Sequence, residues 1–284
     1  MNGLNATHSI HGSTPALGVN AGSQVIYRPA EFLRSVPSVG EREPTPDPTV
    51  RKLFAAHPVL GTLTDQEQRA LLTWSRIHTA TGQQTIFQQH DASNAVILVL
   101  AGHVKLSRPA ADGREVFLDI AGPGVCIGDV AVLQKRPHDA DVIALSPCRL
   151  LLIDARQFRQ IFERRTEALV AMLRLANERF QRVAEQLEDA CVLSASSRLA
   201  KALLRLARLS SSAYNGSAVL PLSQRELGVM TGVSREAVNK QLRVWKAAGW
   251  IALTNGTVTS VRTAALSLQT GDADRGSERQ SALA

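Results

Sequence analysis

The chain has 284 residues, of which 44% are hydrophobic and 4% aromatic, and its formal net charge is +7. This length suits two domains and a tail, no apolar run reaches the length of a membrane span, and the first residues lack the basic and apolar regions of a signal peptide. Its three cysteines (Cys126, Cys148 and Cys191) lie far apart with no C-x-x-C pair. That pattern indicates a reducing cytoplasm and argues against a disulfide framework.

The positive charge is concentrated in one region. Residues 195–265 contain ten lysines and arginines and two acids, so this segment carries +8 while the rest of the chain carries −1. A generally basic protein would spread its charge along the sequence. The clustering is typical of a domain that binds the phosphates of nucleic acid.

Both ends of the chain predict disorder. Residues 1–48 carry six prolines among scattered Gly, Ser and Thr, with a weak signal for a short anchor from Tyr27 to Leu33. Residues 269–284 are polar and small. We therefore expect the ordered part of the chain to run from 49 to 268.

Residues 49–165 combine short helices with short strands. The pattern becomes helical from Val50, and Thr64 is expected to cap the helix that holds Asp65 and Glu67. From Gly82 to about Asp154, β-prone runs alternate with Gly, Asp and Pro; examples are 85–87, 95–100, 104–107, 116–120 and 142–145. Strands this short and evenly spaced indicate an antiparallel β-roll or barrel.

Residues 166–193 predict one long helix with a heptad seam. Its apolar residues alternate at spacings of four and three: Leu169, Leu173, Ala176, Phe180, Val183, Leu187 and Ala190. Such a seam calls for a partner helix and favours a two-fold dimer. The alternative is a helix packed on its own β-roll, which usually shows a wider stripe. We expect a hinge at 191–197, with Ser196 or Ser197 capping the next helix.

Residues 222–251 predict two helices joined by a tight turn. Ser223 and Glu226 form an S-x-x-E capping box for the first helix, which ends near Met230. Glycine in the turn 231–233 suits a positive φ, and Ser234 caps a second helix whose apolar positions are Val238, Leu242 and Trp245. An ordinary αα-hairpin would have the same pattern, but this is also the layout of a helix-turn-helix that enters the DNA major groove.

The residues that follow favour the DNA-binding interpretation. Asn255-Gly256 stands between two β-prone runs, 250–253 and 258–261, and is the strongest short hairpin signal. Helix, turn, helix and hairpin together predict a winged helix.

From these parts the chain resembles the Crp/Fnr family of ligand-responsive bacterial transcription regulators. The resemblance covers roughly 53–266 and includes LAGHVKL (100–106), DGREVFLDIAGPGVCIGDVAVL (112–133), the long helix and the helix-turn-helix, in the family's order. It implies an α+β fold, in which an antiparallel β-roll, the cyclic-nucleotide-binding jelly-roll, is joined by a long dimerisation helix to a winged helix-turn-helix domain. The expected divisions are a tail (1–48), an effector domain (49–165), a dimerisation helix (166–193), a DNA-binding domain (194–268) and a second tail (269–284).

The effector pocket departs from the pattern of the family members that bind cyclic AMP. Those members carry a G-E pair for the ribose hydroxyl and P-R-S/T-A for the phosphate. Here Gly128-Asp129-Val130 matches the first motif with a shortened acid, while His138 and Asp139 replace the arginine and the hydroxyl residue. Arginine is always charged and binds phosphate in a bidentate fork, whereas histidine is roughly half charged near its ordinary pKa of about 6.5.

The effector therefore stays open at this stage. Cyclic AMP is disfavoured; a cyclic dinucleotide is preferred to it, and a degenerate pocket that binds nothing is an alternative. The cysteine cluster of the family's iron–sulfur sensors is missing near the N-terminus, and His57, His78, His90 and His103 lack metal-ligand spacing. No metal or certain cofactor is predicted, although a haem site would leave little trace.

The resemblance places the reader of DNA bases on the second helix. Arg235, Glu236 and Lys240 match R-E-x-x-x-R of the catabolite-activator branch, with lysine in place of its second arginine, and Asn239 is a further candidate. Ser223, Gln224, Arg225 and Ser234 lie at helix N-termini and are expected to hold phosphates. A symmetric dimer implies a palindrome with TGTGA-like half-sites about 34 Å apart. RNA polymerase is left open as a second partner, and no membrane partner is expected.

Two other classes of function compete with a DNA-binding regulator. A sensor module that regulates a partner protein would have no need of the winged helix. An enzyme has little support, because the chain lacks G-x-S-x-G, H-E-x-x-H and a Walker loop.

Overall fold

The computed structural model describes residues 47–211 and 222–270. The predicted tails and the anchor at 27–33 lie outside these residues, apart from a few positions at the tail boundaries. The fold is α+β, with a β-roll, a long helix and a winged helix-turn-helix in that order, which confirms the predicted class. Among the described residues, no helix is both long and apolar enough to cross a membrane.

Three short helical segments precede the β-roll. They are α2 (Pro48–Ala56), the 3₁₀ segment η1 (Leu60–Thr62) and α3 (Asp65–Thr73). Asp47 caps α2, and its side chain accepts from the Thr49 amide. Thr64 and Glu67 form the capping box of α3, as predicted for Thr64.

The β-roll consists of two four-stranded antiparallel sheets, ordered β1-β8-β3-β6 and β2-β7-β4-β5. Its elements are β1 (Ser75–Ala80), β2 (Thr85–Phe87), β3 (Ala95–Ala101), β4 (Val104–Pro109), β5 (Glu115–Ala121), β6 (Cys126–Ile127), α4 (Asp129–Gln134), β7 (Asp141–Ala144), β8 (Cys148–Asp154) and α5 (Ala155–Phe162). Five of these strands coincide with the predicted runs.

Strand β3 is almost continuously apolar because both of its faces are covered. Its side chains alternate between the two faces of the sheet. Ile97 and Val99 lie in the core between the sheets, while Val96 and Leu98 pack against the helices α2, α3 and α5. The roll therefore has an inner core and a second core beneath its helical cover.

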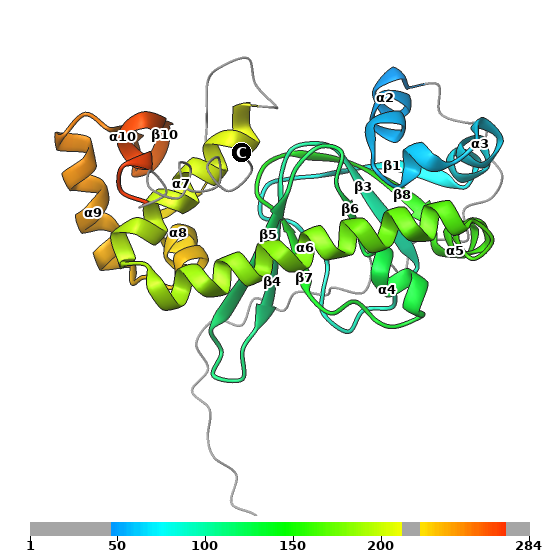
Figure 1. The fold of residues 1–284 in the computed structure, drawn as a ribbon, viewed down its shortest axis with the longest axis horizontal. Helices are drawn as coiled ribbons and strands as arrows, with labels where there is room; N and C mark the ends of the chain where they lie inside the picture. The colour runs from blue at the N-terminus through cyan, green and yellow to red at the C-terminus, as the bar shows by residue number, and fades with distance from the viewer. Residues whose placement is uncertain (1–46, 212–221, 271–284) are drawn as a thin grey trace, which may run out of the picture.

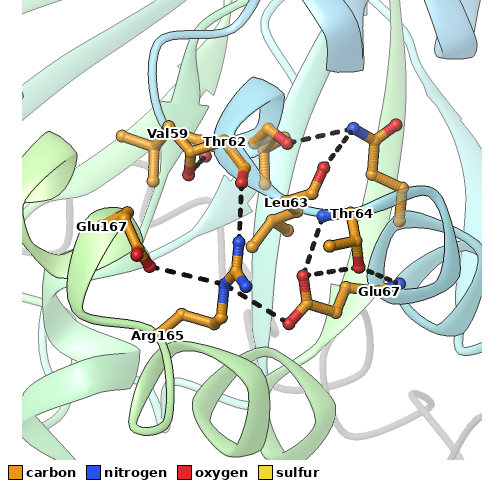
Figure 2. A network of polar contacts seen from close by, with 9 residues as sticks. Val59, Thr62, Leu63, Thr64, Glu67, Arg165 and Glu167 are labelled. Atoms are coloured by element: carbon orange, nitrogen blue, oxygen red, sulfur yellow. Dashed lines mark hydrogen bonds and ion pairs between the residues drawn. The ribbon is translucent and has the colours of Figure 1, made fainter.

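Helix α6 (Thr166–Val192) runs along the roll from α5 to the second half of the molecule (Figure 1). Arg165 anchors its start by donating to the Thr62 carbonyl at 3.2 Å and by lying 3.5 Å from Glu67 and 3.8 Å from Glu167 (Figure 2). One side chain thus joins η1, α3 and α6.

Helix α6 carries two apolar faces. Ala168 and Met172 are buried against the roll. Five residues of the predicted seam are exposed large hydrophobics: Leu169, Leu173, Phe180, Val183 and Leu187. The seam is therefore free in the single chain, alongside a separate face that packs on the roll.

The winged helix-turn-helix follows α6 at one end of the molecule (Figure 1). It comprises α7 (Ala195–Ser211), α8 (Gln224–Thr231), α9 (Arg235–Ala247), β9 (Ile251–Thr254), β10 (Thr257–Val261) and α10 (Thr263–Ser267). Asn255 and Gly256 adopt positive φ between β9 and β10, which confirms the predicted hairpin turn.

The break between α6 and α7 corrects one expectation. The Ser194 hydroxyl accepts from the Ser197 amide at 3.1 Å, so Ser194 caps α7 and the predicted caps Ser196 and Ser197 lie inside the helix. A cap must precede the first helical residue, and that residue is Ala195.

Candidate nucleic-acid interface and effector pocket

The exposed side of α9 presents a cluster of polar side chains. Val238, Leu242 and Trp245 are fully buried and fix the helix on the domain. The opposite side forms an open surface lined by Arg235, Glu236, Asn239, Lys240, Arg243 and Val244. The structure thus brings together the four predicted base-reading residues.

The N-terminus of α9 is held by Ser234, whose hydroxyl accepts from the Ala237 amide. The carboxylate of Glu236 accepts from its own backbone N–H and from the Ser234 hydroxyl, and both bonds lower its pKa. Glu236 is therefore ionised at neutral pH and can act only as an acceptor.

Two glycines shape the turn between α8 and α9. Gly232 ends α8 with φ 64°, as the sequence predicts. At Gly228 a Cβ atom would lie only 2.7 Å from the Val233 carbonyl oxygen. Gly228 lets the two helices approach. It was not predicted from the sequence, although a glycine inside a short helix is a signal of such a close contact.

A polar chain ties α9 to α8 and to the wing. Asn239 donates to the Gln224 side-chain oxygen at 2.8 Å, and Gln224 donates to the Gly256 carbonyl at 3.2 Å. Neither side chain points freely into solvent. Both act first as supports for the reading surface.

The predicted phosphate-binding residues lie around the start of α8 and α9. Ser223, Arg225 and Ser234 are exposed. Ser223 completes a capping box with Glu226. Helix α8, which begins with Gln224 and Arg225, contacts strand β5 of the roll.

In the effector domain, Asp129 is held by Arg179, a residue that was not predicted from the sequence. Gly128 takes φ 79° before α4, and the side chain of Asp129 is only 3% exposed. Both of its oxygens accept from the Arg179 guanidinium at 3.0 Å, and that guanidinium also donates to the Cys126 carbonyl at 2.9 Å. The predicted pocket acid thus faces α6.

A signal for Arg179 was present in the sequence. Ala168, Met172 and Leu175 form the stripe of α6 that packs on the roll, and Arg179 continues this stripe by one turn. A charged residue within an inward stripe requires a buried partner of opposite charge.

His138 does not supply the cation expected from an arginine at its position. Its ring stacks on Phe87 with centroids 3.7 Å apart, and it is 3% exposed. Burial lowers the pKa of His138 to about 4. The half-charged histidine expected from the sequence is therefore neutral at pH 7, because the ring is removed from water.

The fold keeps two of the predicted pocket residues together and exposes two others. Gly128 and His138 are in close approach, since a Cβ atom on Gly128 would lie 2.8 Å from the imidazole. The Asp139 side chain is 81% exposed and pairs with Arg108 at 2.7 Å, and Val130 is also exposed. The structure joins Gly128 with His138 and turns Asp139 toward solvent.

Both halves of the chain match described families. Residues 78–165 match the cyclic nucleotide-binding domain, and residues 197–268 match the Crp-like helix-turn-helix domain. The CRP-like cAMP-activated global transcriptional regulator of Mycobacterium tuberculosis is 30% identical over 60% of this chain and 76% of its own length. The chain belongs to the Crp/Fnr family of transcription regulators.

Further members of the Crp/Fnr family resemble the chain in sequence or fold. The cyclic AMP receptor protein of Thermus thermophilus is 27% identical over 74% of this chain and 94% of its own length. FixK2 from Bradyrhizobium japonicum has a TM-score of 0.61 at 17% identity, covering 69% of this chain and 96% of its own. The c-di-GMP-responsive regulator CLP of Xanthomonas campestris has a TM-score of 0.57 at 19% identity, and the match covers 76% of this chain and 100% of that structure's chain. The two structures support the fold alone.

Proposed function

We propose that the chain is a cytoplasmic homodimer that reads palindromic DNA through α9 and responds to an effector other than cyclic AMP. As a Crp/Fnr-type DNA-binding transcription regulator with a cyclic nucleotide-binding domain, it resembles proteins that are regulators and not enzymes. We further propose that residues 49–165 sense, 166–193 dimerise and 194–268 bind DNA.

The observation that carries the DNA-reading proposal is the exposed polar side of α9 within a segment of charge +8. Arg235 offers a fork for guanine O6 and N7, and Glu236 accepts from a cytosine amine. Lys240 is a single-point donor whose base choice is looser. Ser223, Gln224, Arg225 and Ser234 fix the register by holding phosphates.

Selection from a random DNA library tests this assignment. We expect the wild-type chain to select a palindrome with TGTGA-like half-sites, and Arg235→Ala and Glu236→Ala each to relax one base pair of it. Arg225→Ala is the control, because loss of a phosphate contact weakens all sequences alike. If both α9 variants return the wild-type motif unchanged, α9 is not the reader.

Dimerisation is supported by the seam of α6, in which Phe180 and Leu187 are each 66% exposed. Apolar side chains at heptad spacing gain free energy by packing against the same seam of a second chain. Phe180→Glu or Leu187→Glu is expected to give a monomer with weak affinity for DNA, since each variant buries an unpaired charge.

Analytical ultracentrifugation measures the oligomeric state directly. Gln181→Glu is the matched control, because it adds the same charge one residue away from the seam. An unchanged dimer in both seam variants would contradict the proposal that α6 forms the dimer interface.

The effector assignment depends on Asp129, His138 and Asp139. Arg179 holds Asp129, His138 is neutral, and Asp139 points to solvent. No residue of the P-R-S/T-A motif thus offers a cation to the phosphate of cyclic AMP. A cyclic dinucleotide in a rearranged site is our preferred effector. Beside a second copy of the chain, RNA polymerase is a further protein partner that we propose.

A second candidate is a regulator that needs no ligand. The observation that favours it is that Arg179 and His138 occupy the site from within the chain. Calorimetry of the full chain against cyclic AMP, cyclic GMP and cyclic di-GMP separates the two. Binding of a dinucleotide supports the first candidate, binding of cyclic AMP contradicts it, and binding of none supports the second.

A further inference from the structure

An apolar groove lies between the first half of α6 and the segment that follows α2. It is lined by Pro58, Thr62, Val170, Ala171 and Leu175, and its volume is about 460 Å³. Val170 is 43% exposed, and Ala171 and Leu175 are half-buried. An apolar hollow of this size on a protein surface is typical of a site that receives apolar groups from a binding partner.

Charged side chains of alternating sign border the groove along α6. In chain order they are Glu167, Arg174 and Glu178, and all three are exposed. Glu167 lies 3.8 Å from Arg165 at the start of α6 (Figure 2). Neither Arg174 nor Glu178 forms an ion pair with another of the described residues. The groove is therefore complementary to a segment whose charges run plus, minus, plus.

The groove lies on the side of α6 away from the heptad seam. Successive residues of an α-helix are turned by about 100°, so Ala171, Arg174 and Glu178 are centred about 160° from the seam. A second chain whose helix packs on the seam leaves the groove open. The second chain's helix is therefore not the group that fills it.

The chain itself approaches the groove from its N-terminal side. Asp47 is fixed at the start of α2 by its cap and by its ion pair with Arg149 of β8. From Asp47 to Pro58 the chain spans at most about 25 Å, because α2 rises about 1.5 Å per residue. A stretch as long as 33–47 spans about 20 Å as a flexible chain and about 45 Å when extended. Residues just before position 34 can therefore reach the groove.

Residues 27–34 (YRPAEFLR) have the composition that the groove requires. Tyr27 and Phe32 are the only Tyr, Phe or Trp residues in 1–46, and Leu33 follows directly. The charged residues of the segment run plus, minus, plus: Arg28, Glu31 and Arg34. This order complements the minus, plus, minus of the groove, whichever way the segment runs.

We propose that residues 27–34 dock in this groove of their own chain, with Tyr27 and Phe32 among its apolar residues and Glu31 near Arg174. A tethered segment has an effective concentration on the order of millimolar, so modest contacts are enough to hold it. The docking joins the N-terminal region to α6 on the side that the seam leaves free. It involves neither DNA nor an effector, so it stands or falls separately from the proposed function.

Photo-cross-linking of the full chain tests the docking. The photoreactive residue p-benzoylphenylalanine takes the place of Phe32, and mass spectrometry locates the residues that it captures. We expect capture within 58–62 and 166–178. Mixing isotope-labelled and unlabelled chains shows whether the captured residues belong to the same chain. The same photoreactive residue in place of Leu283, near the other end of the sequence, is the control and should not capture the groove.

A substitution in the groove shows whether capture depends on its apolar lining. Val170→Glu places a charge among apolar residues and should lower capture about fivefold or more. Val116→Glu is the matched control, because Val116 is an exposed valine of β5 outside the groove. It should leave capture unchanged.

A charge exchange tests the alignment of the segment. Arg174→Glu should lower capture about two- to fivefold, because it replaces an attraction by a repulsion at the surface. Adding Glu31→Arg to that variant restores the opposite signs and should restore capture.

The proposal is overturned by capture at a site outside the groove, by capture only between different chains, or by unchanged capture in Val170→Glu. A groove that serves another protein would give the first of these outcomes. If Val170→Glu does not fold, the charge exchange decides alone: the proposal fails unless Arg174→Glu lowers capture and Glu31→Arg restores it.

Discussion

The DNA-reading surface and the effector pocket are built from opposite kinds of contact. On α9 the supports are short-range: Ser234 caps the helix, and Asn239 reaches Gln224 on the preceding helix. In the pocket the deciding contacts join distant segments, since Asp129 meets Arg179 of α6 and His138 stacks on Phe87 of β2. Tertiary packing can therefore place a side chain differently from what a local sequence pattern predicts.

The comparison also concerns charge. The reading surface keeps its ionised groups in water, available to a partner. The pocket removes its acid and its imidazole from water and compensates each within the chain. A surface poised for an external ligand and a site satisfied from within should respond differently to substitution.

The largest effect is expected from Arg179→Ala. This variant leaves the Asp129 carboxylate buried without a partner, which costs about 3–5 kcal/mol of folding free energy. Urea unfolding measures the loss. Arg174→Ala, an exposed arginine on the same helix, is the control and should change stability by less than about 0.5 kcal/mol. Equal stability of the two variants would show that the Arg179–Asp129 pair does not stabilise the fold as a buried ion pair.

The next effect is a pH dependence that arises from His138. Its pKa is lowered from 6.5 to about 4 in the folded chain, so below pH 6.5 the unfolded state binds a proton that the folded state does not. The contribution of His138 to the free energy of unfolding is therefore fully present above pH 6.5. It is lost as the pH drops toward 4, by up to about 3 kcal/mol.

The variant that isolates His138 is His138→Phe, which keeps an aromatic ring against Phe87. Between pH 7 and 4, we expect the free energy of unfolding of this variant to depend less steeply on pH than that of the wild type. His57, whose pKa burial also lowers to about 4, accounts for a further part. His90→Asn, at an exposed position, should leave the slope unchanged; an unchanged slope in His138→Phe would contradict the buried neutral imidazole.

The sequence predicted most of the elements because their signals are local. The capping boxes at Thr64 and Ser223 and the Asn255-Gly256 turn each depend on residues within four positions. The order of the parts then identified the family. The cap of α7 was misplaced by two or three residues because 194–197 contains three serines, and any of them can cap a helix.

The pocket was harder to predict for a physical reason. The motif comparison placed His138 and Asp139 side by side in one site, but the loop and bend before β7 turn these two neighbouring side chains in different directions. One side chain is buried against Phe87 and the other pairs with Arg108 in solvent. Arg179 lies 50 residues from Asp129, and no local pattern joins them.

A smaller effect is expected on the reading surface from Lys240→Arg. The guanidinium restores the second arginine of the R-E-x-x-x-R pattern and adds a second parallel donor, so discrimination at one base pair should increase by about 1 kcal/mol or more. Competition binding with single-base variants of the selected palindrome measures it. Lys246→Arg, outside the surface that α9 presents, is the control. Equal gains in the two variants would indicate a general gain in charge attraction.

The smallest effect is expected at the hinge, from Ser194→Ala. Its hydroxyl satisfies the Ser197 amide in the first turn of α7, and loss of such a cap costs about 1 kcal/mol. Ser196→Ala is the matched control, because Ser196 lies within the helix and its hydroxyl contacts only the Ser194 hydroxyl among the contacts described. Exchange of the first amides of α7 should rise in Ser194→Ala and stay near wild type in Ser196→Ala. The reverse order would move the start of α7 to the position expected from the sequence, and would lengthen the hinge between α6 and the DNA-binding domain.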